Sequence, residues 1–353
     1  MGLWKDCLMP REFLLSNKSS IRLHAILEQS LSETGALGAT LALLVDGNVM
    51  FRAGLGGLAD QPDAKFYAYS VTKSVLAALV LQLAEAGRLD LERPIRTWLP
   101  EVQVRTPITL RQLLNHTGGM PDYGGISSYQ QAVRRSPETA WKPSRYMELL
   151  SDATLLFAPG QGWSYSNLGY MLISRVIEAV GGLTPDESLA SRIAAPLGLT
   201  ETRFVSSRAD AMDLTPGFEG SPGRENIIAR YDPGWVAHGV VRSTALELAR
   251  LMEGVTGGRF LGEFWLGQML SAVPVPGAIS MGRDPGYGLG LMAETMPFGR
   301  VVGHNGEGPG YSVACWSLTA GGHRLVGACL VNQSIPNAAQ TLLFRAFSAV
   351  LGA

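Results

Sequence analysis

The sequence predicts a mixed α/β (α+β) fold in which strands from both ends of the chain form one antiparallel sheet flanked by helices. Strand-like runs occur near the N-terminus, at residues 39–44, and return only from about residue 300. Short helical patterns punctuated by proline and glycine fill the region between them. We therefore expect residues 1–88 and 240–353 to form an α/β domain and residues 89–239 to form a helical inserted domain.

The N-terminal elements begin with a predicted β-hairpin. An apolar run is followed by Asp46-Gly47-Asn48, which supplies turn-forming residues before a second apolar run. Residues 75–86 (VLAALVLQLAEA) have the composition of a buried helix, and Gly87 is suited to end it.

The remaining elements follow from the same patterns. Helices are expected at residues 109–115, 144–150, 168–180 and 185–196, strands at 300–304, 311–318 and 324–331, and a final helix at 338–351. Cys315 and Cys329 would be cross-strand neighbours if the last two strands pair, and we expect reduced core thiols. With Cys7, the three cysteines show no metal-binding spacing.

Composition narrows the class of protein. The 353 residues are 46% hydrophobic and 17% charged, which indicates a compact globule large enough for a sizeable core. A net charge of −1 does not favour binding to nucleic acid or to an anionic membrane, so a small-molecule substrate is expected. Charged residues and a proline interrupt residues 1–20, so no signal peptide or spanning helix is predicted and a cytoplasmic location is expected.

A Ser-x-x-Lys motif, Ser70-Val71-Thr72-Lys73, opens the predicted helix. At a spacing of three residues the two side chains share one helix face. A lysine desolvated at a helix start can lose enough basicity to take a proton from a hydroxyl, which makes the serine a nucleophile. The alternative is that Ser70 only caps the helix, although Lys73 is unfavourable in a first turn.

Two further groups of polar residues could also contribute to a catalytic site. Tyr165 and Asn167 lie in a loop before a predicted helix, where a phenol can exchange protons and an amide can hold a lysine. Helix capping by Asn167 is the simpler alternative. His304-Asn305-Gly306 precedes Glu307 in a glycine-rich stretch that lets backbone N–H groups approach a ligand, or that simply ends a hairpin.

Ser-x-x-Lys, Tyr-x-Asn and His-x-Gly, in this order, resemble the serine β-lactamase and penicillin-binding protein superfamily. The likeness is to its class C branch, which includes family VIII-type carboxylesterases and D-amino-acid peptidases. It extends from about Leu31 to the C-terminus and includes residues 113–121 (LLNHTGGMP) and 157–160 (FAPG). The resemblance implies a β-lactamase/transpeptidase-like fold.

The resemblance also implies residue roles. Ser70 would be the acylated nucleophile and Lys73 the proton acceptor that activates it. Tyr165 would share base duty in acylation, protonate the leaving group and activate water for deacylation, and Asn167 would orient Lys73 and the substrate. The backbone N–H groups of Ser70 and Glu307 would bind the oxyanion. Four more residues are expected to line the pocket: Asp122, Tyr123, Trp235 and Tyr311.

The third motif departs from the usual pattern. β-Lactamases and DD-peptidases usually have Lys-Thr-Gly there, and the lysine helps to hold a substrate carboxylate. Here His304 takes that position beside Gly306, and no lysine occurs after Lys142. A histidine near its ordinary pKa is mostly neutral at pH 7, so recognition of an anionic substrate should weaken unless an arginine comes from elsewhere.

The sequence therefore predicts a serine hydrolase with an acyl-enzyme at Ser70, acting on small esters with weak β-lactam hydrolysis. No metal and no organic cofactor are expected. Other interpretations are a class C-like β-lactamase, a D-aminopeptidase or amidase, an acyltransferase, and a catalytically silent binding protein of the same fold. The motifs do not report the physiological substrate or the oligomeric state.

Overall fold

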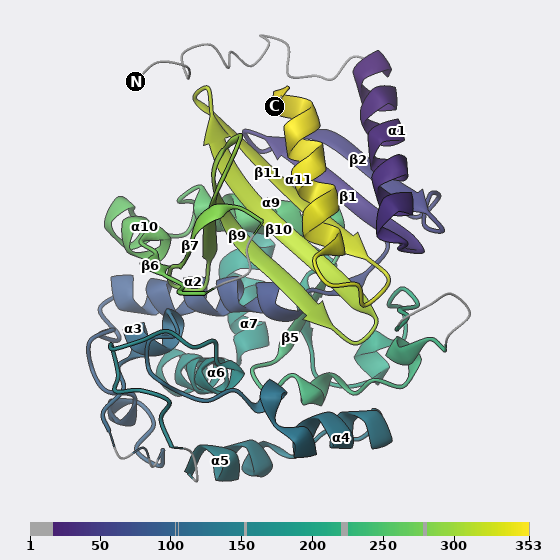
Figure 1. Cartoon of the computed structure of the whole chain (residues 1–353). Coiled ribbons are helices and arrows are strands. Elements are labelled where there is room, and N and C mark those ends of the chain that lie inside the picture. The colour runs from purple at the N-terminus through teal and green to yellow at the C-terminus, as the bar shows by residue number, and fades with distance from the viewer. Residues whose placement is uncertain are drawn as a thin grey trace.

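A computed structural model of the chain describes residues 17–102, 104, 106–151, 154–219, 225–277 and 281–352. Figure 1 shows a large sheet covered by helices in its upper part and a largely helical lower part. The predicted α/β fold with an antiparallel sheet flanked by helices is confirmed. The division into two domains stays a prediction.

The large sheet combines both ends of the chain. Its strand order is β2-β1-β11-β10-β9-β8-β7-β6, and every pair of neighbours is antiparallel. The strands are β1 (Gly38–Val45), β2 (Asn48–Gly56), β6 (Val273–Pro274), β7 (Arg283–Tyr287), β8 (Met292–Met296), β9 (Gly299–Gly308), β10 (Tyr311–Ala320) and β11 (His323–Val331). The predicted hairpin turn is present, with Asp46 and Gly47 both at positive φ, as a tight β-hairpin requires.

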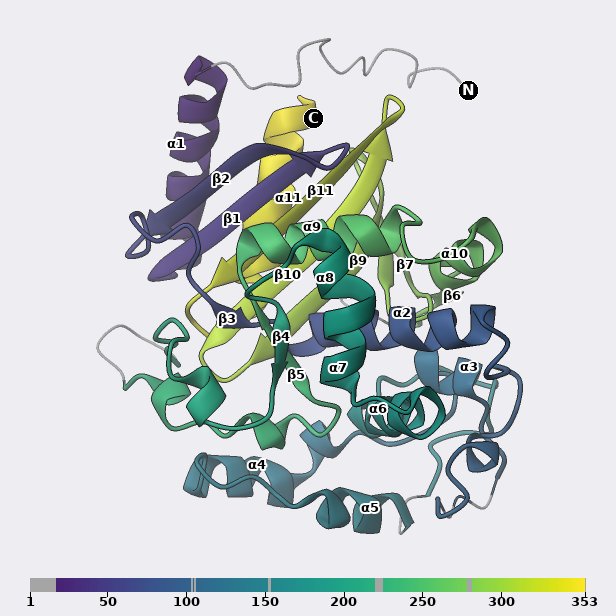
Figure 2. The same ribbon diagram turned by 180° about the vertical axis from the view of Figure 1, so that it is seen from behind.

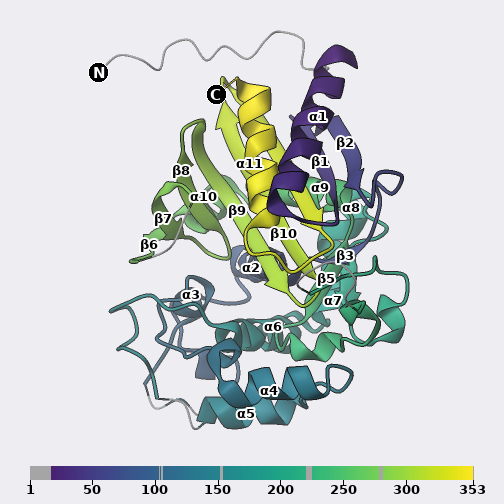
Figure 3. The same ribbon diagram turned by 45° about the vertical axis from the view of Figure 1, so that its right-hand side comes forward.

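Helices cover both faces of this sheet. Helices α1 (Asn17–Thr34) and α11 (Ala338–Leu351) lie side by side on one face (Figure 3), and α9 (Ala245–Thr256) packs on the other, as the view from behind shows (Figure 2). Cys315 and Cys329 are free and buried on opposite faces, since Cys315 pairs with Ala328 rather than Cys329. Cys7 lies outside the described residues.

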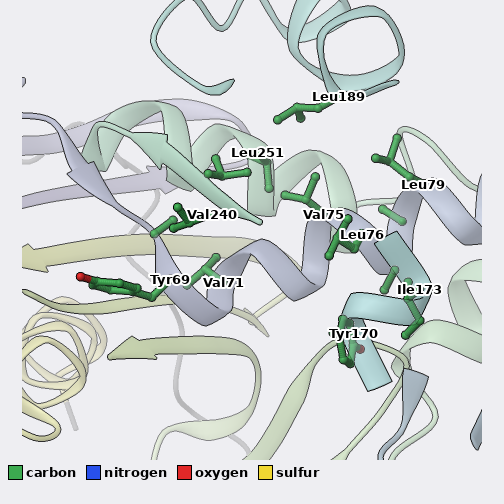
Figure 4. Close-up of a cluster of buried hydrophobic side chains, with 14 of the residues drawn as sticks. Tyr69, Val71, Val75, Leu76, Leu79, Tyr170, Ile173, Leu189, Val240 and Leu251 are labelled. Carbon is green, nitrogen blue, oxygen red and sulfur yellow. The ribbon is translucent and has the colours of Figure 1, made fainter. Parts of the chain in front are cut away.

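Helix α2 (Thr72–Glu85) lies between the sheet layer and the helical part. Nearly all of its residues are buried, and Gly87 follows it at positive φ as predicted. Figure 4 shows α2 between Leu251 of α9 on one side and Tyr170 and Ile173 of α6 (Asn167–Gly181) on the other. A helix buried on all sides holds its first turn rigidly, which matters for Ser70 and Lys73.

The helical part contains α3 (Leu110–Leu114), α4 (Ser127–Arg135), α5 (Pro143–Ser151), α6 (Asn167–Gly181), α7 (Pro185–Leu189) and α8 (Ala195–Leu197). Helix α10 (Glu263–Leu270) lies near the C-terminal strands, and a small second sheet has the order β3-β5-β4, from Phe66–Tyr67, Val240–Ser243 and Arg203–Val205. Capping boxes begin α3 at Thr109 and α7 at Thr184, which explains why both predicted starts were close.

Candidate active site

Ser70 lies in a short 3-10 helix, Tyr69–Val71, that leads into α2. Val71 is the N-cap of α2 and makes no side-chain capping bond, so Ser70 is not the helix cap. Tyr69 has φ +43°, a conformation that costs energy for a residue with a side chain. Its ring packs near Tyr67 and Tyr311, and its hydroxyl donates to the carbonyl of Pro309. This packing holds Ser70 at a sharp bend.

Lys73 is fully buried and faces Ser70. Its Nζ lies 3.1 Å from Ser70 Oγ, 2.7 Å from Asn167 Oδ1 and 3.3 Å from His238 Nε2. Burial lowers the pKa of Lys73 to about 7, and the negative charge of Asp122 opposes that shift. A substantial share of Lys73 is therefore a neutral amine near pH 7, which can accept the proton of Ser70.

Asn167 is oriented by Asp122. One carboxylate oxygen of Asp122 accepts from the backbone N–H of Asn167 at 2.9 Å, and the other lies 3.3 Å from Asn167 Nδ2. This leaves Oδ1 to face Lys73. The cap of α6 is Ser166, whose Oγ accepts from the N–H of Gly169, so Asn167 does not cap the helix.

Tyr165 donates its phenolic proton to Ser70 Oγ at 2.8 Å. Burial raises the pKa of Tyr165, and the hydrogen bond with Ser70 only partly opposes this shift. The His116 ring packs against the Tyr165 ring with 4.4 Å between centroids. The phenol is therefore neutral, fixed in place, and able to pass a proton at the nucleophile.

Strand β9 brings the third motif close to Ser70. A Cβ on Gly306 would lie 2.2 Å from the carbonyl oxygen of Ala68, so only glycine lets β9 approach the segment before Ser70 this closely. Strand β9, which includes Glu307, contacts the short helix that carries Ser70. The Glu307 side chain is exposed, and its carboxylate accepts from the backbone N–H of Asn337 at 2.8 Å.

His304 is buried and uses both ring nitrogens inside the protein. Nε2 lies 2.9 Å from the hydroxyl of Tyr287, and Nδ1 lies 2.6 Å from the carbonyl oxygen of Asn305. A carbonyl oxygen can only accept, so Nδ1 carries the proton and Nε2 accepts from Tyr287. Burial, assisted by the positive charge of Lys73, lowers the pKa of His304 to about 3, so His304 is neutral at pH 7.

A cavity of about 610 Å³ opens beside Ser70. Its described lining includes Trp163, Tyr165 and Asn167 beside the start of α6, His304 of β9, and Asn337 and Gln340 at the start of α11. Among the described lining residues no arginine or lysine occurs, whereas Glu294 and Glu307 contribute carboxylates. An arginine that could replace the missing lysine, a possibility that the sequence left open, is thus not found among these residues.

Several predicted pocket residues lie elsewhere and act through packing. Trp235 is buried in the loop before β5, Tyr123 is buried and hydrogen-bonded to that loop, and Tyr311 is buried against Tyr69; none of the three lines this cavity. Asp122 also lies outside the lining; it contacts Asn167 directly, and its charge acts on the pKa of Lys73. These large aromatic side chains therefore pack in the core outside the described cavity lining.

The sequence reasoning missed His238, Trp163, Tyr287 and Glu294. Trp163 lies two residues before Tyr165 in the same loop, and Tyr287 lies between Gly286 and Gly288, a pattern that favours close approach to a ligand. His238 and Glu294 show no local signal, because tertiary packing alone brings them to the site.

Comparison with known proteins places this geometry in a family. Residues 23–349 match the family model described as Beta-lactamase. The chain belongs to the beta-lactamase family. It is 28% identical over 265 residues to Penicillin-binding protein 4* of Bacillus subtilis (strain 168), which covers 69% of this chain and 55% of that protein. It is 31% identical over 234 residues to Esterase EstB of Burkholderia gladioli, which covers 61% of this chain and 59% of that protein.

The chain therefore spans little more than half the length of these two curated relatives. Among solved structures, a D-stereospecific amidohydrolase from Streptomyces sp. aligns with a TM-score of 0.81 and 28% identity, covering 92% of this chain and 98% of that one. D-amino acid amidase from Ochrobactrum anthropi SV3 aligns with a TM-score of 0.77 at 22% identity, which shows the shared beta-lactamase family fold. No helix in the described ranges is long and apolar enough to cross a membrane.

Proposed function

We propose that this member of the beta-lactamase family is a serine hydrolase that forms an acyl-enzyme at Ser70 and prefers small carboxylic esters. Weak β-lactam hydrolysis is part of the proposal, as is the expected cytoplasmic location. The names of its relatives include an esterase, a D-aminopeptidase and an amidohydrolase, all hydrolases. The convergence of Ser70, Lys73 and Tyr165 supports the same chemistry.

Acylation begins when the neutral Lys73 amine takes the proton of Ser70 Oγ, which then attacks the substrate carbonyl carbon. The N–H groups of Ser70 and Glu307 stabilise the oxyanion. As the intermediate collapses, the bond to the leaving oxygen breaks, and Tyr165 delivers a proton to that oxygen and is reprotonated from Lys73. In deacylation, water attacks the acyl carbon while Tyr165 takes a proton from the water and passes its own proton to neutral Lys73. The bond between the acyl carbon and Ser70 Oγ then breaks, Lys73 returns the proton to Ser70 Oγ, and the carboxylic acid is released.

The substrate preference rests on one observation: the described cavity wall carries no cation and includes two carboxylates. Neutral His304, with both nitrogens bonded within the protein, is a poor partner for a substrate carboxylate. β-Lactams and peptides ending in D-Ala-D-Ala carry such a carboxylate. Neutral esters avoid its repulsion from Glu294 and Glu307.

A second candidate, an amidase acting on amino-acid amides, is supported by the same carboxylates. An ammonium group on the acyl part of a substrate would be attracted to Glu294 or Glu307. The similarity to a D-stereospecific amidohydrolase points the same way. An amino-acid amide with a free amine should therefore be one of the substrates compared.

Parallel assays separate these functions. Nitrocefin, p-nitrophenyl butyrate, a D-Ala-D-Ala peptide and D-phenylalanine amide would be compared by kcat/KM, with an alcohol acceptor added to detect acyl transfer. We expect the neutral ester to be turned over fastest. Much faster turnover of nitrocefin or the peptide would reject the ester preference, and faster turnover of the amide would favour the amidase. Folded protein without turnover or Ser70 adduct would indicate a silent binding protein.

A further inference from the structure

His238 lies in a tightly held loop just before β5. Gly239 has φ +84°, and its neighbours fix the chain: the hydroxyls of Tyr129 and Tyr146 donate to the carbonyl of Trp235 at 2.8 Å and 3.2 Å. The N–H of Ala237 donates to the Tyr123 hydroxyl at 3.0 Å. The His238 ring is only 2% exposed. An imidazole held this firmly has a defined direction toward its neighbours.

The ring points Nε2 at the catalytic lysine, with 3.3 Å between His238 Nε2 and Lys73 Nζ. Burial, together with the positive charge of Lys73, keeps the pKa of His238 well below its usual value, so the imidazole is neutral. A neutral imidazole has one nitrogen with a free lone pair. When the proton is on Nδ1, Nε2 accepts a hydrogen bond from Lys73.

The number of N–H bonds on a neutral amine limits where the lone pair of Lys73 can point. Neutral Lys73 has two N–H bonds and one lone pair. In the tautomer with the proton on Nδ1, Asn167 Oδ1 and His238 Nε2 are two acceptors, at 2.7 Å and 3.3 Å from Nζ, and can together engage both N–H bonds. Ser70 Oγ, at 3.1 Å, is then the third polar neighbour of Nζ and the one left for the lone pair.

We propose that His238 is a positioning residue that accepts a hydrogen bond from Lys73 and so aims the lysine lone pair at the Ser70 hydroxyl. This inference deepens the proposed function and rests on it. His238 touches neither the substrate cavity nor Ser70 among the described contacts, and it acts through Lys73 alone.

The His238 ring also forms a wall between Lys73 and a second cavity of about 890 Å³. Exposed residues such as Ser144 and Asp186 line that cavity, which is therefore open to solvent, whereas Lys73 does not line it. A small residue at position 238 would let water approach the lysine. Test variants must therefore fill the space of the imidazole while changing only its ability to accept a hydrogen bond.

Other polar and ionisable groups around Lys73 also set its ionisation: Ser70, His116, Asp122, Tyr165, Asn167, Tyr170 and His304. Asp122 favours the ammonium form, and burial favours the amine. A hydrogen-bond acceptor stabilises an ammonium more than an amine, because bonds to charged donors are stronger. Loss of the His238 acceptor should therefore lower the pKa of Lys73.

Three variants test the proposal. His238→Gln retains an acceptor about where Nε2 lies, whereas His238→Met has similar length without a good acceptor, and His238→Phe fills the ring space without one. Phe204→Leu serves as a control, because Phe204 lines the second cavity and contacts the position of Gly239 without contacting Lys73 among the described residues. Thermal unfolding of each variant reports on folding.

The measurement is kcat/KM for p-nitrophenyl butyrate from pH 5 to 9. We expect His238→Met and His238→Phe to lose about 10- to 100-fold in the plateau value, with the acid limb moved to lower pH. His238→Gln should keep most of the rate, and Phe204→Leu should resemble wild type. A merely structural role would lower the plateau without moving the acid limb and would overturn the proposal, as would Met and Gln variants of equal activity. An inactive wild type would instead reject the proposed function itself.

Discussion

Replacement of Lys73 by methionine should abolish activity and, at neutral pH, stabilise the fold. Burial lowers the pKa of Lys73 from 10.5 to about 7. Between these values the unfolded chain binds a proton that the folded protein does not, so wild-type stability rises with pH across this window. Below about pH 7 the folded protein and the unfolded chain both bind the proton, so this gain in wild-type stability is absent. Methionine keeps the unbranched stem packed and removes this dependence.

The size of the effect follows from the shift. Each pH unit in the window corresponds to about 1.4 kcal/mol, so the free energy of unfolding of Lys73→Met minus that of wild type should fall by about 4 kcal/mol between pH 7 and pH 10. Lost hydrogen bonds of the amine change the offset between the two proteins much more than the slope.

Urea unfolding at four pH values would measure this difference, with loss of ester hydrolysis recorded in parallel. Lys65→Met is the matched control, because acidic partners raise the pKa of Lys65 and move its titration above this window. A stability difference that does not change with pH would show that Lys73 titrates as an ordinary lysine, and the reasoning about its role as base would fail.

Five further substitutions test individual parts of the site. Ser70→Ala and Lys73→Ala should each abolish most turnover, with the double variant little worse in kcat; additive losses would contradict a shared step. Tyr165→Phe should slow hydrolysis of an ethyl ester more than of a p-nitrophenyl ester, whose leaving group needs no proton; equal losses in kcat/KM would argue against proton delivery. Gly306→Ala should lower the free energy of unfolding by about 1–3 kcal/mol, because the added Cβ would lie 2.2 Å from a backbone oxygen; an unchanged unfolding midpoint would refute that contact. His304→Lys should raise nitrocefin turnover relative to neutral ester turnover, and an unchanged ratio would show that position 304 does not face the substrate carboxylate.

Site residues that are close together in the sequence could be predicted from their spacing, whereas those brought together by tertiary packing could not. The spacing of Ser70 and Lys73 predicts a shared helix face, and the structure places their reactive atoms 3.1 Å apart. The approach of Tyr165 cannot follow from spacing, because 95 residues separate it from Ser70. The position of Tyr165 beside Ser70 was expected only from the resemblance to the serine β-lactamase and penicillin-binding protein superfamily.

Residues that act through packing were the hardest to predict. Trp235 and Tyr123 were expected in the pocket, but they anchor the loop that carries His238. His238 itself stands alone in the sequence between alanine and glycine, with no periodicity or motif. Strands β6, β7 and β8 were missed because they are short and contain proline, glycine or charged residues, which weaken a strand pattern.

The central claim is that Ser70 is the nucleophile and that Lys73 ionisation controls its reactivity. Peptide mass spectrometry after brief exposure to a fluorophosphonate at several pH values tests both parts in one experiment. The account predicts a single adduct on Ser70 whose rate of formation rises through about pH 7, with no adduct in Ser70→Ala. Folded wild-type protein that remains unlabelled, or that carries the adduct on another residue, would contradict it.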